Sequence, residues 1–118
     1  MKIFRFDPEV GKSIDRYNSS GFIISRIVQL FDEAVVNCAY LSSGGIIGFH
    51  QATLPQLFLV VQGEGWVSSE ASNKISIKAG QAAYWEIEER HESGTNTGMI
   101  VIIIEGSRFD PAKLMPLV

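Results

Sequence analysis

Two segments of the chain are apolar at every position, and they restrict the fold more than any other feature. Residues 57–61 read Leu-Phe-Leu-Val-Val, and residues 99–104 read Met-Ile-Val-Ile-Ile-Ile. Successive side chains of a strand point to opposite faces, so a strand without polar alternation has to be covered on both sides. We therefore expect a sandwich or barrel whose outer face is covered by a terminal segment or by a second copy of the chain. The second case predicts a homodimer.

Short runs rich in β-branched residues occupy most of the remaining chain. Together with the two apolar segments they predict about eight strands, which is typical of an all-β sandwich or barrel. The expected strands cover residues 22–30, 34–41, 46–50, 56–62, 66–69, 74–78, 81–86 and 99–105, with a hairpin turn at 31–33 and a turn at 63–65. Asp7-Pro8 and Asp110-Pro111 each resemble the start of a short helical turn, and we interpret both as terminal clasps on the barrel.

Length and composition exclude several classes of protein. A chain of 118 residues suits one domain, here residues 1–118, and 46% hydrophobic against 19% charged residues excludes a mainly disordered chain. A net charge of -3 argues against a nucleic-acid partner. The single cysteine, Cys38, makes no internal disulfide, and the first residues lack the apolar core of a signal peptide. We expect a cytoplasmic protein with no membrane partner.

The positions of a few glycines and of both histidines form a recognisable spacing. Five residues separate Gly44 from His50, six separate Gln56 from Gly63, and ten separate Gly80 from His91. This spacing resembles the two motifs of the cupin family over residues 44–105. The resemblance implies an all-β, cupin-type double-stranded β-helix (jelly-roll) barrel with short terminal helical turns.

The resemblance also implies a divalent metal such as iron, manganese, nickel or zinc. In cupins that bind one, the first motif supplies two histidines and a glutamate, and the second motif supplies one histidine. His50 and His91 stand at two of the histidine positions, but Ala52 stands at the third and Gln56 at the glutamate position. An amide is a weaker metal ligand than a carboxylate. The candidate metal ligands are therefore His50, Gln56 and His91, and we expect weak or absent metal.

Other polar residues near these positions have two readings each. The acidic residues Glu86, Glu88, Glu89 and Glu92 either supply a carboxylate beside His91 or form a solvated loop. Cys38 shares a strand face with Val36 and Tyr40, and it lines the barrel if that face points inward. The aromatic residues Trp66, Tyr84 and Trp85 are interpreted as packing residues; Tyr84 and Trp85 point to opposite faces, so one of them faces the lumen.

Three functions are consistent with this sequence. The first is a small cupin that binds a small organic ligand in the barrel, with a lumen lined by His50, Gln56, Phe58 and His91. The second is a metal-dependent cupin enzyme, either a dioxygenase or an isomerase, with open coordination positions for its substrate. The third is a dimeric interaction domain with a filled lumen and no ligand.

Overall fold

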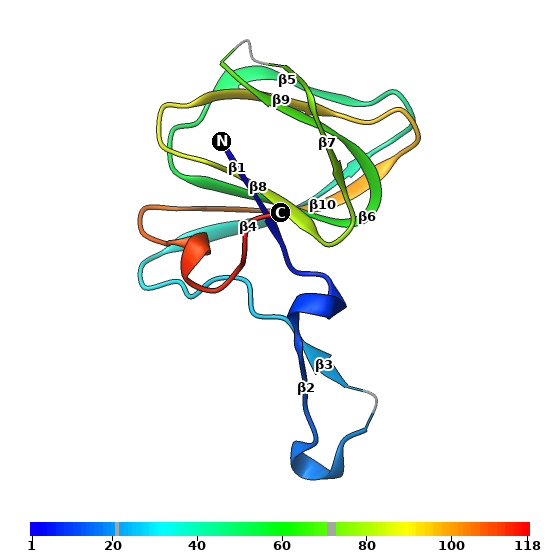
Figure 1. Cartoon of the computed structure of the whole chain (residues 1–118). Helices are drawn as coiled ribbons and strands as arrows, with labels where there is room; N and C mark the ends of the chain where they lie inside the picture. The colour runs from blue at the N-terminus through cyan, green and yellow to red at the C-terminus, as the bar shows by residue number, and fades with distance from the viewer. Residues whose placement is uncertain (21, 71–72) are drawn as a thin grey trace.

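The computed structural model describes residues 1–20, 22–70 and 73–118, and strands make up most of it (Figure 1). The elements in chain order are β1 (Lys2–Arg5), η1 (Pro8–Val10), β2 (Lys12–Ser13), η2 (Arg16–Asn18), β3 (Ile23–Ile24), β4 (Ala34–Leu41), β5 (Ile46–Gln51), β6 (Gln56–Ser69), β7 (Ile75–Lys78), β8 (Gln81–Trp85), β9 (Arg90–Gly94), β10 (Met99–Gly106) and η3 (Pro111–Lys113). Each η element is a single 3₁₀ turn. All strand pairs are antiparallel.

Two layers of strands face each other and share one long strand. One layer has the order β1-β8-β6-β10-β4, and in the other β5 pairs with β9, while β9 and β7 pair with β6. β6 takes part in both because it bends rather than turns back. Gly63 has a φ of 85°, and the pairing of β6 with β10 changes register between Ile100 and Val101. The predicted turn at 63–65 is therefore wrong: an extra residue and a left-handed glycine bend one continuous strand.

Side chains from both layers fill the interior between them. The buried residues of this core are Phe58, Val60, Val67, Ile77, Ala83, Trp85, Met99 and Val101. They include alternate residues of the two apolar segments, which confirms that these segments are strands buried on one face by the opposite layer.

The other face of the same strands is covered by the two ends of the chain. Leu57 and Leu59 pack with Phe4 and Met115 in a second buried cluster, and Phe109 lies against Tyr84 with ring centroids 5.7 Å apart. The turns at Pro8–Val10 and Pro111–Lys113 form where Asp-Pro pairs predict them. The clasp interpretation is confirmed: terminal segments cover the outer face of β6.

A bidentate ion pair holds the first clasp. The Arg5 guanidinium donates two hydrogen bonds of 2.8 Å to the two carboxylate oxygens of Asp7. These bonds lower the pKa of Asp7 to about 2.

Three of the described strands are not predicted by the pattern, and one predicted strand is almost absent. β1, β2 and β9 are new, while only Ile23–Ile24 of the expected strand 22–30 is a strand. The hairpin turn at 31–33 is also wrong, because β3 pairs with β2 and β4 pairs with β10. Local β-propensity is not sufficient at 22–30, since a strand needs a neighbour for its backbone groups.

Residues 12–20 and 22–26 form a projection that we call the arm. It contains β2 and β3 and extends away from the two layers (Figure 1). Apolar side chains on it are exposed, among them Phe22, Ile23 and Ile24. No helix in the described part of the chain is long and apolar enough to cross a membrane.

Candidate functional site

Side chains from both layers meet at one end of the interior. On the first layer, Trp85 of β8 lies opposite Gln56 of β6, which in turn lies opposite Glu105 of β10. The Gln56 amide nitrogen donates a hydrogen bond of 2.7 Å to Glu105 Oε1. On the second layer, His50 of β5 and His91 of β9 are cross-strand partners, and their ring centroids are 4.5 Å apart. The pairing of strands thus brings both predicted histidines together.

His91 is held in one orientation deep in this end of the barrel. It is only 2% exposed, and its ring stacks on Trp85 with centroids 4.1 Å apart and planes 15° from parallel. Its Nδ1 lies 3.2 Å from the carbonyl oxygen of Glu89. A carbonyl oxygen only accepts, so Nδ1 carries the proton and the neutral ring has an unprotonated Nε2. This buried Nε2 has no hydrogen-bond partner in the described residues.

His50 has the same arrangement on the neighbouring strand. Its Nδ1 lies 2.6 Å from the Gly48 carbonyl oxygen and donates to it, so that the neutral ring also has a free lone pair on Nε2. The side chain is exposed, in contrast to His91. The pair therefore consists of one buried and one accessible hydrogen-bond acceptor.

The environment of His91 favours its neutral form. Burial is the main reason that its pKa lies below the ordinary value of 6.5, and the adjacent His50 acts in the same direction. The Glu89 carbonyl works against both. A neutral His91 accepts a hydrogen bond or a metal ion through Nε2.

This state of His91 predicts a stability that falls on acidification. The unfolded chain binds a proton near pH 6.5 and the folded chain only at lower pH, so stability is full above that value and is lost as the pH falls towards the folded pKa. The loss is about 1.4 kcal/mol for each pH unit within this window. Urea unfolding at a series of pH values measures it. His91→Gln should flatten the profile, and an unchanged profile in that variant would assign the effect to other groups.

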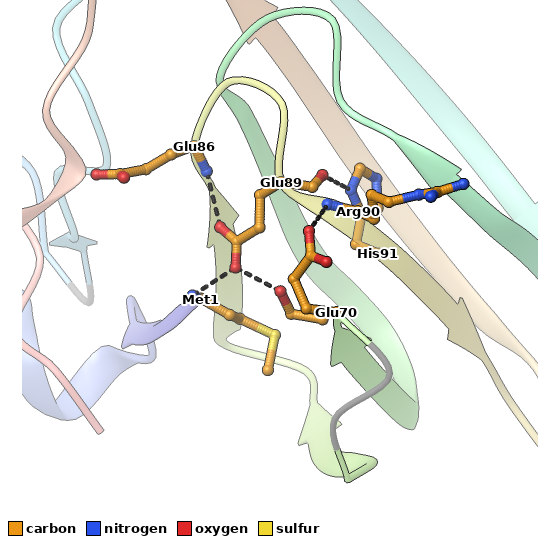
Figure 2. A network of polar contacts seen from close by, with 7 residues as sticks. Met1, Glu70, Glu86, Glu89, Arg90 and His91 are labelled. Atoms are coloured by element: carbon orange, nitrogen blue, oxygen red, sulfur yellow. Dashed lines mark hydrogen bonds and ion pairs between the residues drawn. The ribbon is translucent and has the colours of Figure 1, made fainter.

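The carboxylates of Glu89 and Glu70 bind groups other than the His91 ring. Glu89 points to the amino group of Met1, 2.7 Å from its Oε2, and it also accepts from Ser69 Oγ (Figure 2). Burial opposes the charge of Glu89, but these hydrogen bonds outweigh it and lower its pKa. Glu70 accepts from the Arg90 backbone N–H at 2.8 Å. Both side chains fix the backbone around His91 and supply no ligand to its ring.

A divalent metal does not fit the side chains at this end of the barrel. No group of three or more His, Cys, Asp or Glu residues in the described chain is placed to hold a metal ion. Ala52 is buried at the third histidine position, where its backbone N–H donates to the Glu89 carbonyl oxygen at 3.1 Å. Gln56 already donates to Glu105. Two imidazoles and a neutral amide make an incomplete donor set for iron, manganese, nickel or zinc.

One residue of the site also lines a cavity at the start of β4. A cavity of about 380 Å³ lies beside Glu105, on the side away from Gln56, and its lining consists of Glu33, Ala34, Val35, Leu54 and Glu105. Val35 is the cross-strand partner of Glu105, so the cavity continues the row formed by Trp85, Gln56 and Glu105. Glu105 is therefore the residue that the cavity shares with the site.

The remaining candidate residues divide between the interior and the surface. Phe58 is buried beside Trp85, with ring centroids 5.7 Å apart, and so belongs to the floor of the barrel. Trp85 faces the interior and Tyr84 the outside, as strand alternation predicts. Cys38 is exposed with Val36 and Tyr40, so that face points outward and Cys38 does not line the lumen.

Glu105 is the site residue that the sequence does not reveal. The motif spacing gives no role to it. It becomes part of the site because β10 pairs with β6 in a register that sets Glu105 beside Gln56. Its one signal in the sequence is that it is the charged residue that ends the apolar run 99–104.

Known proteins resemble this chain in structure and not detectably in sequence. No family model matches it, and a search of curated proteins finds no match. Among solved structures, an RmlC-like cupin from Shewanella frigidimarina is 23% identical, with a TM-score of 0.58 over 69% of this chain and 68% of that one. An RmlC-like cupin family protein with a double-stranded β-helix fold from Methanocaldococcus jannaschii is 14% identical, with a TM-score of 0.60 over 78% and 80%.

A third structure carries a name that includes an activity. A predicted oxalate decarboxylase from Thermotoga maritima is 20% identical, with a TM-score of 0.55 over 59% of this chain and 63% of that chain. At such identities the likeness concerns the fold alone. The chain therefore has the cupin double-stranded β-helix fold, as the motif spacing predicts.

Proposed function

We propose that this cupin-fold chain binds a small organic molecule at the end of the barrel where His50 and His91 meet. One observation carries the proposal: the buried Nε2 of His91 has no partner in the described residues, although buried polar atoms are nearly always hydrogen-bonded. The Nε1 of Trp85, stacked on the same ring, is likewise buried without a partner. A bound molecule would satisfy groups that the protein leaves open.

The chemistry of the site restricts the ligand. Unprotonated imidazole nitrogens and the Glu105 carboxylate accept hydrogen bonds, so the ligand needs N–H or O–H donors. The carboxylate is the only charge among the side chains that meet there when both rings are neutral, which favours a neutral or cationic ligand over an anion. The ligand size is limited, because Trp85 and Phe58 fill the inner end.

A thermal-shift screen with neutral polyols, amines, organic acids and aromatic compounds tests this function. A ligand present at about 100 times its Kd stabilises the folded chain by about 2.7 kcal/mol. We expect the hit to carry donors, and the shift to disappear in His50→Ala and Glu105→Gln. Glu92→Gln is the matched control, since Glu92 follows His91 on β9 and its side chain therefore points to the opposite face of that strand. A hit that still stabilises both site variants, or a screen without any hit, contradicts the proposal.

Metal analysis of the untagged protein separates this proposal from the metal-dependent enzyme, a dioxygenase or isomerase. We expect less than one equivalent of bound iron, manganese, nickel or zinc after reconstitution. If the protein bound stoichiometric metal, and if His50→Ala and His91→Ala each lost it, the metal-dependent enzyme would be supported in place of ligand binding. A cytoplasmic location and the lack of nucleic-acid and membrane partners stay predictions from composition.

We also propose that the chain forms a homodimer, because two apolar surfaces lack a cover within one copy. The first is the outer face of β4, where Val36 and Tyr40 are 57% and 76% exposed, and the second is the arm. A two-stranded hairpin is only marginally stable by itself. Lys12, Arg16 and Arg26 of the arm form no ion pair with the described residues, and neither does Glu33 directly before β4. These charges are complementary, so a second copy is the occupant that we infer.

Light scattering after size exclusion is expected to give twice the chain mass of 13.0 kDa. Tyr40→Lys should produce a monomer, because it places a charge in the apolar outer face of β4. Ile87→Lys is the control, since Ile87 is exposed on the turn after β8. A monomeric parent protein, or a dimer that persists in Tyr40→Lys, would refute this arrangement.

A further inference from the structure

A second cavity lies on the outside of the barrel, away from the histidines. Its volume is about 480 Å³, within the range of small-molecule sites. Its lining consists of Glu64, Gly65, Trp66, Ser76, Ile77, Lys78, Gln81, Asn96 and Thr97. In the pairing of β6 with β7, Glu64 lies opposite Lys78 and Trp66 opposite Ser76. The alternate residues Val67 and Ile77 are buried in the core, so these four side chains share the outer face. We call this cavity the outer groove.

Hydrogen bonds fix the loop that forms one wall of the outer groove. Thr95 is 2% exposed, and its Oγ1 donates to the Glu64 carbonyl oxygen at 2.6 Å. Thr95 Oγ1 also accepts from the backbone N–H groups of Thr97 and Gly98, at 3.2 and 2.9 Å. Ser43 Oγ donates to the Asn96 carbonyl oxygen at 2.7 Å. The wall is thus tied to β6 on one side and to the turn before β5 on the other, which orders it before any ligand binds.

The aromatic side chain of the outer groove depends on a glycine. A Cβ at position 94 would lie 2.5 Å from the Trp66 ring, so the indole lies directly over the backbone of Gly94. The ammonium group of Lys74 lies over a face of this ring, 3.9 Å from the ring centroid. Lysine is a flexible and strongly hydrated side chain, which makes this face accessible once Lys74 moves aside.

Polar groups of both kinds surround that ring. Glu64 and Lys78 form no ion pair with each other or with any other described residue. Gln81 Oε1 accepts from the Lys78 backbone N–H at 3.1 Å, which leaves its amide nitrogen as a donor. Among the lining residues, one carboxylate and one ammonium give a net charge of zero. The outer groove therefore offers acceptors and donors in equal measure to a neutral molecule.

We propose that the outer groove binds a neutral saccharide. Sugar hydroxyl groups donate to carboxylates and accept from ammonium and amide groups, and Glu64, Lys78 and Gln81 supply these partners. The apolar C–H face of a sugar ring packs against an aromatic face, and Trp66 supplies it at the edge of the same groove. An anion would meet the Glu64 carboxylate, and an apolar compound would bury the unpaired charges, so both fit less well. The site is distinct from the one at His50 and His91, and either can exist without the other.

Titration of the isotope-labelled protein with cellobiose, maltose and galactose tests the proposal. We expect one of them to move the indole Nε1–H resonance of Trp66 and the amide resonances of Asn96 and Thr97, with a millimolar Kd. The indole resonance of the fully buried Trp85 serves as an internal control and should not move. Glu64→Gln and Gln81→Ala each change an accessible side chain and should weaken binding about tenfold.

Two further measurements complete this test. A titration with inorganic phosphate tests whether Lys74 and Lys78 attract an anion. If phosphate moved the indole resonance of Trp66 and none of the sugars did, the proposal would be overturned. Glu92→Gln, outside the outer groove, should bind the sugar like the parent chain. Sugar binding that is unchanged in both Glu64→Gln and Gln81→Ala, or no shift with any of the three sugars, would equally refute a saccharide site here.

Discussion

Replacing Trp85 with alanine is expected to lower the free energy of unfolding by about 3–5 kcal/mol. The side chain is completely buried, meets the Phe58 ring in a T-shaped arrangement and stacks on the face of the His91 ring. Its removal leaves a cavity that β8 and β6 cannot close, since both strands are fixed by pairing on each side. We expect a loss near the lower end of this range. The indole N–H is buried without a partner in the described chain, so removing it also removes an unfavourable contribution to the stability of the native state.

Urea unfolding of Trp85→Ala and Trp85→Phe measures this effect. The phenylalanine variant keeps most of the ring contacts and should lose much less. Tyr17→Ala is the aromatic control, since Tyr17 is 94% exposed and should change stability by less than about 0.5 kcal/mol. Equal losses in Trp85→Ala and Tyr17→Ala would show that Trp85 is not part of the core. Water entering beside His91 in Trp85→Ala should also raise the pKa of that histidine towards 6.5.

The strands that carry the core could be predicted because strands buried on both faces are apolar at every position. Residues 57–61 and 99–104 lie on β6 and β10, which have neighbours on both edges and cover on both faces. β9 has no such apolar pattern, since its sequence Arg-His-Glu-Ser-Gly is polar. It is a strand because β5 and β6 supply hydrogen-bond partners for its backbone. The opposite error at 22–30 has the same origin, since among the described residues only Ile23 and Ile24 of this range find a strand partner, the short β2.

The candidate site shows the same division between local and long-range information. The resemblance to the two cupin motifs implies that His50 and His91 belong to one site, and the pairing of β5 with β9 brings them together. The contact of Gln56 with Glu105 depends on the register between two strands that are far apart in the sequence, and the outer groove depends on the register of β6 with β7. Neither register can be read from a short motif.

Gly63→Ala is expected to destabilise the fold by about 3 kcal/mol, a large effect for a single methyl group. Gly63 has a φ of 85°, which disfavours any residue with a Cβ, and a Cβ at this position would overlap the backbone carbonyl of Gly98. The Gly98 carbonyl belongs to the backbone directly before β10, so this group does not move aside as a flexible side chain would. Because β6 passes from one layer to the other at this bend, strain here acts on both layers at once.

Two other glycines separate the causes of that loss. Gly44 has a φ of 80° but nothing within 4 Å of the position of a Cβ, so Gly44→Ala should show the conformational cost alone, about 1 kcal/mol. Gly48 has the same open surroundings without a positive φ, and Gly48→Ala should be neutral or slightly stabilising. The expected order of stability, measured by urea unfolding, is therefore Gly48→Ala, then Gly44→Ala, then Gly63→Ala. If Gly63→Ala lost no more than Gly44→Ala, the close approach of β6 to Gly98 would not be needed for the bend that joins the two layers.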